Sequence, residues 1–305
     1  MNALEQLKQF TSVVADTGDV DSIAQYQPDD ATTNPSLILK ALKQNPDSEL
    51  LGEAEALAKQ LQLPTAMCLT ALYGREISRL VPGYVSTEVD PRLSFDQAAT
   101  VEQAKAFIQL YQQLGVDTQR ILIKIAATWE GIQAARQLEA DNIKTNITLL
   151  FAPVQAMAAA QAGATLISPF VGRILDWYKA NQPEALEQGD PGVASVRTIF
   201  QAFKKYGYNT IVMGASFRSS EQIIALAGCD KLTISPALLS ELQNSQQEVI
   251  QQLSGSADGS HAEVVTEAAF RWQLNEDAMA TEKLAEGIRL FSRDIETLEN
   301  MVASR

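Results

Sequence analysis

Lys124 has the most distinctive setting of any ionisable side chain in the sequence. It stands inside the segment ILIKIAA (Ile121 to Ala127), whose other members are all apolar. If this segment is a strand in a protein core, burial disfavours the charged ammonium form. A neutral lysine amine can attack a carbonyl carbon and form a Schiff base. The alternative is a lysine near a strand end whose head reaches solvent, and the residues alone leave the two open.

Two carboxylates, Asp16 and Glu88, stand at the ends of other apolar or β-branched runs, VVAD and VSTE. Either one could instead cap a helix or form a salt bridge. Together with Lys124 they form an aldolase-like set. In such a set the amine forms the electrophile, one carboxylate acts as a base towards a substrate hydroxyl, and the second carboxylate moves protons.

Two arginines, Arg173 in SPFVGR and Arg218 in GASFR, follow later runs. Each has small residues and an expected helix start beside it, so guanidinium and backbone N–H groups could converge on a phosphate. The alternative is a surface arginine paired with an acidic neighbour such as Asp176. For either arginine alone, that alternative is preferred.

The runs that must position these side chains are short, and they recur between longer helical patterns. Several are apolar on both faces, as parallel strands covered on both sides require. The runs comprise residues 11–15, 31–34, 84–89, 121–126, 144–151, 164–168, 209–213 and 230–234.

Eight strands alternating with helices predict an α/β fold of the (β/α)8 TIM-barrel class, with additional N-terminal and C-terminal helices. A doubly wound sheet would usually show a glycine-rich phosphate loop, and neither GxGxxG nor GxxxxGK[ST] occurs. We expect residues 1–305 to form one domain, with the extra C-terminal helices from about residue 262. One helix is expected over residues 95–114, where Ser94 and Gln97 have capping-box spacing.

In such a barrel the chemistry lies at the C-terminal ends of the strands. Residues two apart in a strand point to the same side, so pairs at strand ends are informative. The polar or aromatic residues found there, in chain order, are Asp16, Thr32 with Asn34, Glu88, Lys124, Asn146 with Thr148, Ser168 with Phe170, and Ser216 with Arg218.

The last predicted helix carries an apolar seam with alternating spacings of four and three residues. Its members are Leu284, Ile288, Phe291, Ile295, Leu298 and Val302. The run is barely long enough for a coiled coil. Packing across the barrel or at a dimer contact is preferred.

Composition excludes several classes of function. The 305 residues (33.2 kDa) carry a formal net charge of −13, which would repel nucleic acid over most of the surface. The single histidine and two cysteines leave no convincing Ser/His/Asp arrangement, histidine metal cage or disulfide framework. Proton chemistry must therefore rest on carboxylates or a lysine.

The N-terminus lacks a basic start and an apolar run, which predicts a cytoplasmic protein without a signal peptide. Residues 147–172 carry no charge and are long enough to cross a bilayer. Pro153 can open a helix there and Gly163 can close it. A strand, a short buried helix and a second strand are therefore expected instead of a membrane span.

Several segments together resemble the transaldolase family, from the N-terminal helix to nearly the last one. The matching motifs are VVADTGD (Val13 to Asp19), ATTNPSLI (Ala31 to Ile38), VPGYVSTEVDPRLS (Val81 to Ser94), RILIKIAATWEGI (Arg120 to Ile132), NITLLF (Asn146 to Phe151), LISPFVGRILDWY (Leu166 to Tyr178), VMGASFR (Val212 to Arg218) and AGCDKLTISPALL (Ala227 to Leu239). The resemblance implies a class I aldolase barrel whose Schiff-base lysine lies on the fourth strand. That is where the residues themselves place Lys124.

The resemblance also implies a reaction and a role for each residue. A dihydroxyacetone unit would pass from a ketose phosphate to an aldose phosphate through Lys124, without a metal or a coenzyme, and a homodimer is expected. Asp16 would be the general acid and base, and Glu88 with Thr148 would hold a catalytic water. The implied substrate-binding residues are Thr32, Asn34, Asn146, Ser168, Phe170, Arg173, Ser216 and Arg218.

Three alternatives remain open. Related fructose 6-phosphate aldolases release free dihydroxyacetone, but they typically carry Gln in place of Glu88 and Tyr in place of Phe170. The other two are a barrel enzyme whose Lys124 binds pyridoxal phosphate and a non-catalytic sugar-phosphate binder. Residues 42–78 depart from the family pattern and contain none of the predicted site residues.

Overall fold

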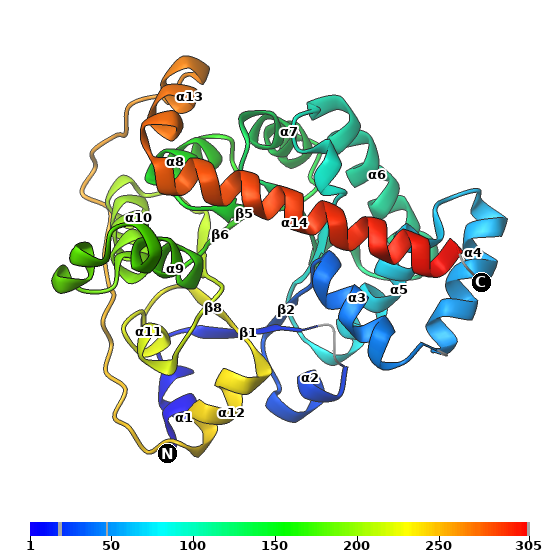
Figure 1. Ribbon diagram of the computed structural model, residues 1–305, viewed down its shortest axis with the longest axis horizontal. Coiled ribbons are helices and arrows are strands. Elements are labelled where there is room, and N and C mark those ends of the chain that lie inside the picture. The colour runs from blue at the N-terminus through cyan, green and yellow to red at the C-terminus, as the bar shows by residue number, and fades with distance from the viewer. Residues whose placement is uncertain (18–19, 47, 304–305) are drawn as a thin grey trace.

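The computed structural model describes residues 1–17, 20–46 and 48–303, and its eight strands close into a parallel barrel in chain order (Figure 1). The predicted (β/α)8 fold is confirmed, and each strand overlaps a predicted run. Gly18 and Asp19, which end the VVADTGD motif, lie outside the described residues. The strands are β1 (Ser12–Asp16), β2 (Asp30–Thr32), β3 (Val85–Glu88), β4 (Ile121–Ala126), β5 (Thr145–Leu150), β6 (Leu166–Pro169), β7 (Ile211–Gly214) and β8 (Lys231–Ile234).

Helices surround the barrel and extend it at both ends of the chain (Figure 1). Those up to β6 are α1 (Ala3–Leu7), α2 (Val20–Tyr26), α3 (Pro35–Gln44), α4 (Glu49–Leu61), α5 (Thr65–Leu80), η1 (Pro91–Leu93), α6 (Gln97–Gln113), η2 (Thr118–Arg120), α7 (Trp129–Ala140) and α8 (Pro153–Gln161). Those after β6 are α9 (Gly172–Asn181), η3 (Pro183–Gln188), α10 (Pro191–Tyr206), α11 (Ser220–Ile224), α12 (Pro236–Asn244), α13 (Glu267–Glu276) and α14 (Ala278–Ala303).

The barrel interior is layered because inward-facing residues repeat every second position along a strand. Val14, Leu122 and Leu166 pack together with Met213 in one buried apolar cluster. Two residues further along their strands stand Asp16, Lys124 and Ser168. The apolar layer therefore closes the barrel beneath a polar layer at the C-terminal ends of the strands.

The uncharged stretch 147–172 forms most of β5, then α8, then β6, as predicted. Pro153 is the first residue of α8, and Gly163 follows the helix with a positive φ of +82°. Among the described residues, no helix is long and apolar enough to cross a membrane.

Helix α6 corrects one local prediction. It begins at Gln97, and its N-cap is Asp96, whose side chain accepts from the Ala99 N–H at 2.9 Å. Ser94 instead donates to the Pro91 carbonyl, in the short η1 turn. The capping-box spacing was misleading because a better acceptor lies closer to the helix.

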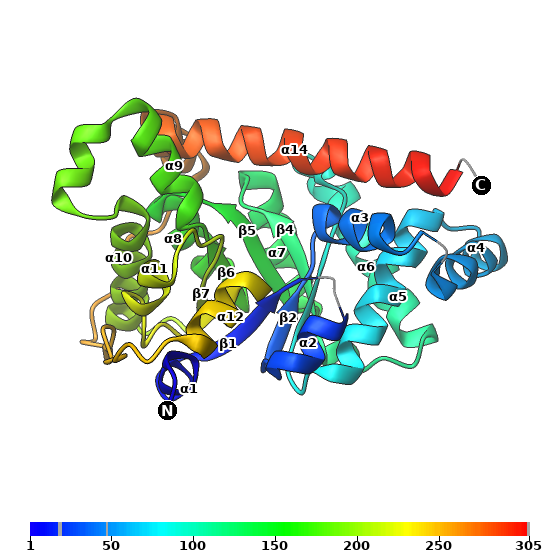
Figure 2. The ribbon, with the colours of Figure 1, turned by 60° about the horizontal axis from the view of Figure 1, so that its bottom comes forward.

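Helix α14 lies across the mouth of the barrel, at the end opposite α1 (Figure 2). Its seam residues Leu284, Ile288, Phe291 and Leu298 are buried in the main core. Three polar contacts fix it to separate parts of the rim: Ser36 of α3 bonds to Asp294, Arg92 of η1 to Glu299, and Trp177 of α9 to Glu282. Packing across the barrel is thus confirmed as the role of the seam.

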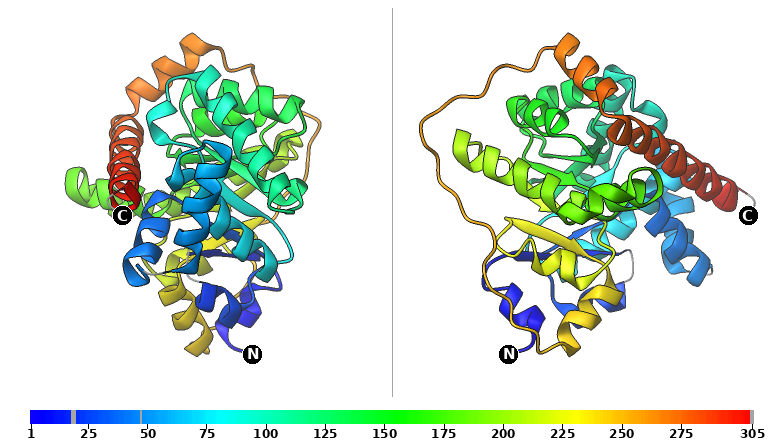
Figure 3. Two further views of the ribbon diagram at one scale, coloured as in Figure 1. Left: turned by 90° about the vertical axis from the view of Figure 1, so that its right-hand side faces the viewer. Right: turned by 60° about the vertical axis from the view of Figure 1, so that its left-hand side comes forward.

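The chain reaches α14 by a long connection. After α12, residues 245–266 run along the outside of the barrel without regular secondary structure, and α13 begins at Glu267 (Figure 3). The C-terminal helices therefore begin close to the expected residue 262. The connection takes the chain from the N-terminal end of the barrel to its mouth.

Two helical glycines predict opposite effects of the same substitution. A Cβ on Gly131, in the first turn of α7, would overlap the Ala126 carbonyl oxygen, whereas nothing lies within 4 Å of one on Gly52 in α4. Gly52→Ala should raise the free energy of unfolding by about 0.5–1 kcal/mol, because alanine favours the helix. Gly131→Ala should lower it by roughly 1–3 kcal/mol through overpacking. Urea unfolding checks both, and a stabilising Gly131→Ala would contradict the close approach of α7 to β4.

Candidate active site

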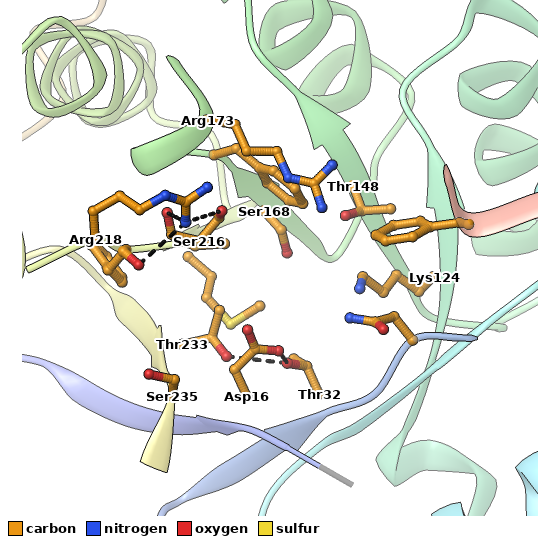
Figure 4. A pocket seen from close by; sticks show the side chains of 16 residues that line it. Asp16, Thr32, Lys124, Thr148, Ser168, Arg173, Ser216, Arg218, Thr233 and Ser235 are labelled. Carbon is orange, nitrogen blue, oxygen red and sulfur yellow. Dashed lines mark hydrogen bonds between the residues drawn. The ribbon is translucent and has the colours of Figure 1, made fainter. Parts of the chain in front are cut away.

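A cavity of about 220 Å³ opens at the C-terminal ends of the strands, beneath α14. Figure 4 shows Arg173 and Arg218 on one side of it and Asp16 with Thr32 across from them. It is lined by Asp16, Thr32, Asn34, Lys124, Thr148, Ser168, Phe170, Arg173, Met213, Ala215, Ser216, Phe217, Arg218, Thr233, Ser235 and Phe291.

Lys124 is buried and paired with Glu88. Its Nζ lies 3.1 Å from Glu88 Oε2, and the two side chains are only 6% and 3% exposed. The strand register sets this pair, because Glu88 of β3 is the partner of Lys124 in β4, and Asn146 of β5 is its partner on the other side. The lysine head does not reach bulk solvent, so the solvent-exposed alternative is wrong.

Asp16 ends β1 and faces the same cavity. Its Oδ1 accepts a hydrogen bond from Thr32 Oγ1 at 3.2 Å. Burial raises the pKa of Asp16 above its ordinary value, and the nearby Lys124 charge only partly offsets this. Burial likewise raises the pKa of Glu88, again opposed by Lys124. Both carboxyls therefore hold a proton more readily than an exposed carboxyl does, which suits them to act as general acid and base.

Polar groups on the neighbouring strands are connected to one another. Ser168 Oγ donates to Asn146 Oδ1 at 2.6 Å, and Asn146 Nδ2 donates to Ser86 Oγ at 3.0 Å. Thr148 Oγ1 is buried and has no hydrogen-bond partner among the described residues. A buried hydroxyl beside the cavity is a suitable place to hold a water molecule.

The two arginines differ in how they are held. Arg218 forms an ion pair with Asp176, at 2.7 Å between Nη2 and Oδ2. Arg173 has no carboxylate partner within salt-bridge distance in the described part of the chain; its guanidinium instead packs over the rings of Phe170 and Phe291. Burial lowers the pKa of Arg173, and the Arg218 charge lowers it further. An anion bound between the two would relieve both effects.

The described residues contain no group of three or more His, Cys, Asp or Glu side chains placed to hold a metal ion. Cys68 and Cys229 are both free and buried. Burial raises the pKa of Cys68, and it raises that of Cys229 to about 12. Neither thiol is therefore activated as a nucleophile.

The chain resembles known proteins over almost its whole length. Residues 13–302 match the family described as transaldolase/fructose-6-phosphate aldolase. The chain is similar to Transaldolase A of Salmonella typhimurium (54% identical) and Transaldolase A of Escherichia coli K12 (52% identical), with all of both chains covered in each case. It is 53% identical to the transaldolase of Shewanella pealeana, over all of this chain and 98% of that one. The chain belongs to the transaldolase/fructose-6-phosphate aldolase family.

All of the site residues predicted from the sequence line the cavity, except Glu88 and Asn146. Glu88 is buried against Lys124, and Asn146 is buried behind Ser168. Asn34 has a second task, because its Oδ1 accepts the Leu37 N–H at 2.9 Å and so caps α3.

The structure also adds site residues that the sequence argument missed. Thr233 lies near the end of β8, bonds to Thr32 at 3.1 Å between hydroxyl oxygens, and is followed two residues later by Ser235. Applying the strand-end rule to the eighth run would have found both. Phe291 was predicted only as a packing residue, because the apolar seam favours packing across the barrel but does not indicate which of its members reaches the cavity.

The raised pKa of Asp16 predicts that this carboxylate, when ionised, destabilises the folded protein. The folded state disfavours its ionised form, at a cost fully present above the folded pKa and absent below the ordinary value of 3.8. Asp16→Asn removes that cost while keeping an acceptor for Thr32. Its melting temperature should exceed that of the wild type by a few degrees at pH 7, and the gain should shrink as the pH falls towards that ordinary value. Thermal unfolding at a series of pH values measures this; a lower melting temperature at pH 7 would show that the carboxylate is stabilising.

Proposed function

We propose that the chain catalyses the transaldolase reaction of the non-oxidative pentose phosphate pathway. It would transfer a dihydroxyacetone unit from sedoheptulose 7-phosphate or fructose 6-phosphate to glyceraldehyde 3-phosphate or erythrose 4-phosphate. The observation that carries the proposal is a buried lysine, 3.1 Å from one carboxylate, that shares a cavity with a second carboxylate and two arginines.

Schiff-base formation would begin when the Lys124 amine attacks the ketose carbonyl carbon. Glu88 accepts the ammonium proton, which frees the amine, and a proton returned through water to the former carbonyl oxygen lets it leave as water. Thr148 would position that water, since its buried hydroxyl has no other hydrogen-bond partner among the described residues. Glu88 and Thr148 thereby serve both imine formation and its later hydrolysis.

Carbon–carbon cleavage would depend on Asp16. It removes the proton from the C4 hydroxyl, the C3–C4 bond breaks, and the electron pair moves into the iminium on Lys124. The first aldose then leaves. When the enamine attacks the second aldehyde, Asp16 returns its proton to the new oxygen, so the raised pKa of this carboxyl suits both directions.

The remaining site residues would bind the sugar phosphate. Arg173, Ser216 and Arg218 would hold the phosphate, and Arg173 is available because it has no carboxylate partner in the described part of the chain. The three-carbon unit that stays bound to Lys124 carries hydroxyl groups. These would form hydrogen bonds with the polar residues at the ends of β2, β5 and β6. These are Thr32, Asn34, Asn146 and Ser168, with Phe170 forming an apolar wall.

The acidity of the protein is compatible with phosphate-bearing substrates because charge acts locally. A net charge of −13 repels anions at long range, but two arginines at the end of one cavity create a positive region within low-dielectric walls. The charge of Arg218 contributes to the lowered pKa of Arg173, so the two cations repel each other. A bound phosphate would neutralise that repulsion.

We also infer that the protein acts in the cytoplasm as a homodimer on sugar phosphates, with neither nucleic acid nor a membrane as partner. The net charge of −13 supports the exclusion of nucleic acid. A molar mass in solution of twice the chain mass, measured by light scattering, would support the dimer, and a single chain mass would contradict it.

The decisive experiment is borohydride reduction with fructose 6-phosphate, followed by peptide mass mapping. We expect a reduced three-carbon adduct on Lys124 and none on Lys231, which pairs with Asp30 at 2.5 Å and lines no part of the cavity. Asp16→Ala should still form an adduct, now retaining the whole ketose, because cleavage is slowed and imine formation is not. An unmodified Lys124 would rule out the proposed function.

Phe170 predicts transfer in preference to simple cleavage. It is buried against Phe151 and Arg173 and offers no hydroxyl to position water against the enamine. Phe170→Tyr should increase the release of free dihydroxyacetone from fructose 6-phosphate in the absence of an aldehyde acceptor. Wild-type protein that releases dihydroxyacetone at the transfer rate would instead favour the aldolase alternative.

A further inference from the structure

The loop that carries Arg218 has little local structure of its own to fix it. Ser216 lies in the left-handed region (φ 59°), and α11, which follows, has only five residues. The ion pair between Arg218 and Asp176 is about two-fifths exposed at both side chains, so it contributes little to holding the backbone. The Ser216 carbonyl accepts the Gly172 N–H at 2.7 Å, and Arg218 Nη1 lies 3.4 Å from Ser216 O, Ser216 Oγ and Phe217 O. These contacts act on Ser216 and on the guanidinium, so the Arg218 backbone needs a support of its own.

A buried glutamine supplies that support. The Arg218 backbone N–H donates to Gln222 Oε1 at 2.8 Å, and Gln222 Nε2 donates to Asp190 Oδ2 at 2.7 Å. Gln222 is only 4% exposed. Both ends of its amide are therefore occupied, one by the loop and the other by the start of a different helix.

Asp190 is itself fixed. Its Oδ1 accepts the N–H groups of Gly192 at 2.8 Å and Val193 at 3.1 Å, which caps α10, a helix of 16 residues. The loop is thus connected through two side chains to one of the longest helices of the barrel. Because Gln222 is buried, losing either hydrogen bond would leave a polar group unpaired away from water.

We propose that Gln222 and Asp190 are positioning residues for the phosphate site, acting through the backbone of Arg218. The inference rests on the proposed function, because it requires that Arg218 bind the phosphate of the substrate. The pair touches no substrate. It sets how well a phosphorylated aldehyde is recognised, while the proton transfers at Lys124 and Asp16 continue unaided by it.

The direction of the hydrogen bonds that Gln222 forms with Asp190 and Arg218 can be reversed by substitution, which gives a direct test. In Asp190→Asn the side-chain oxygen still caps α10, since asparagine is as good an N-cap as aspartate. Its new NH₂ group, however, faces the NH₂ group of Gln222, so one of the two hydrogen bonds is lost whichever way the glutamine amide turns. Adding Gln222→Glu restores both with reversed polarity: the asparagine amide introduced by Asp190→Asn donates to the new carboxylate, which also accepts the Arg218 N–H. The double variant has the same net charge as the wild type.

The measurement is kcat and KM for glyceraldehyde 3-phosphate and for unphosphorylated glyceraldehyde as acceptors, with the donor saturating. Asp190→Asn and Gln222→Met should each raise the KM for the phosphorylated acceptor about tenfold, as expected from one lost hydrogen bond. Their kcat, and the kinetics with glyceraldehyde, should change little. The double variant Asp190→Asn/Gln222→Glu should return the KM to near the wild-type value.

Gln155 provides a matched control. It is also fully buried, accepts the N–H groups of Phe151 and Ala152 at 2.8 and 2.9 Å, and donates to the Ala127 carbonyl at 2.9 Å, but it supports the loop after β5. Gln155→Met should lower the melting temperature at least as much as Gln222→Met, because it loses more hydrogen bonds, while preserving the preference for the phosphorylated acceptor.

The results distinguish failure of the positioning role from failure of the proposed phosphate site. A folded Asp190→Asn that loses activity equally with both acceptors, or a double variant that is not rescued, would overturn the positioning role. Wild-type protein with no preference for the phosphorylated acceptor would instead contradict the phosphate site of the proposed function. If Gln222→Met does not fold, Asp190→Asn and the double variant still decide the question, because both keep the cap of α10.

Discussion

An ammonium group inside an apolar barrel requires a nearby anion, and the structure supplies it as Glu88, 3.1 Å from Lys124. The pairing depends on the register of β3 against β4, which sets the two residues side by side. Below them an apolar layer closes the barrel, and above them the cavity opens. The lysine is therefore buried next to a group that can take its proton. The register of β3 against β4 therefore serves both the stability of the buried lysine and its proposed chemistry.

Helix α14 makes the far end of the chain part of the site. It is fixed to the rim through Ser36, Arg92 and Trp177, and it brings Phe291 to the cavity and over Arg173. Within the described ranges, Arg173 is consequently oriented by aromatic rings and not by a carboxylate. A guanidinium held in this way keeps its hydrogen-bond donors free for an anion while remaining fixed in direction.

The strands, the barrel and most of the cavity residues could be predicted from the amino-acid sequence alone. Inward-facing positions repeat every two residues, and parallel strands all end at one face, so Asp16, Lys124 and Thr148 could be brought together without coordinates. Helix starts were less certain: Asp96 and not Ser94 caps α6, because neighbouring polar residues compete for the same N–H groups.

Other features, namely which side chains contact one another between separate elements, became known only from the folded structure. The pairing of Lys124 with Glu88, the position of Phe291 over Arg173, and the chain from Arg218 through Gln222 to Asp190 join residues far apart in sequence or on separate elements. No periodicity encodes such contacts. They depend on how helices pack around the barrel, which the chain specifies only through the sum of its packing interactions.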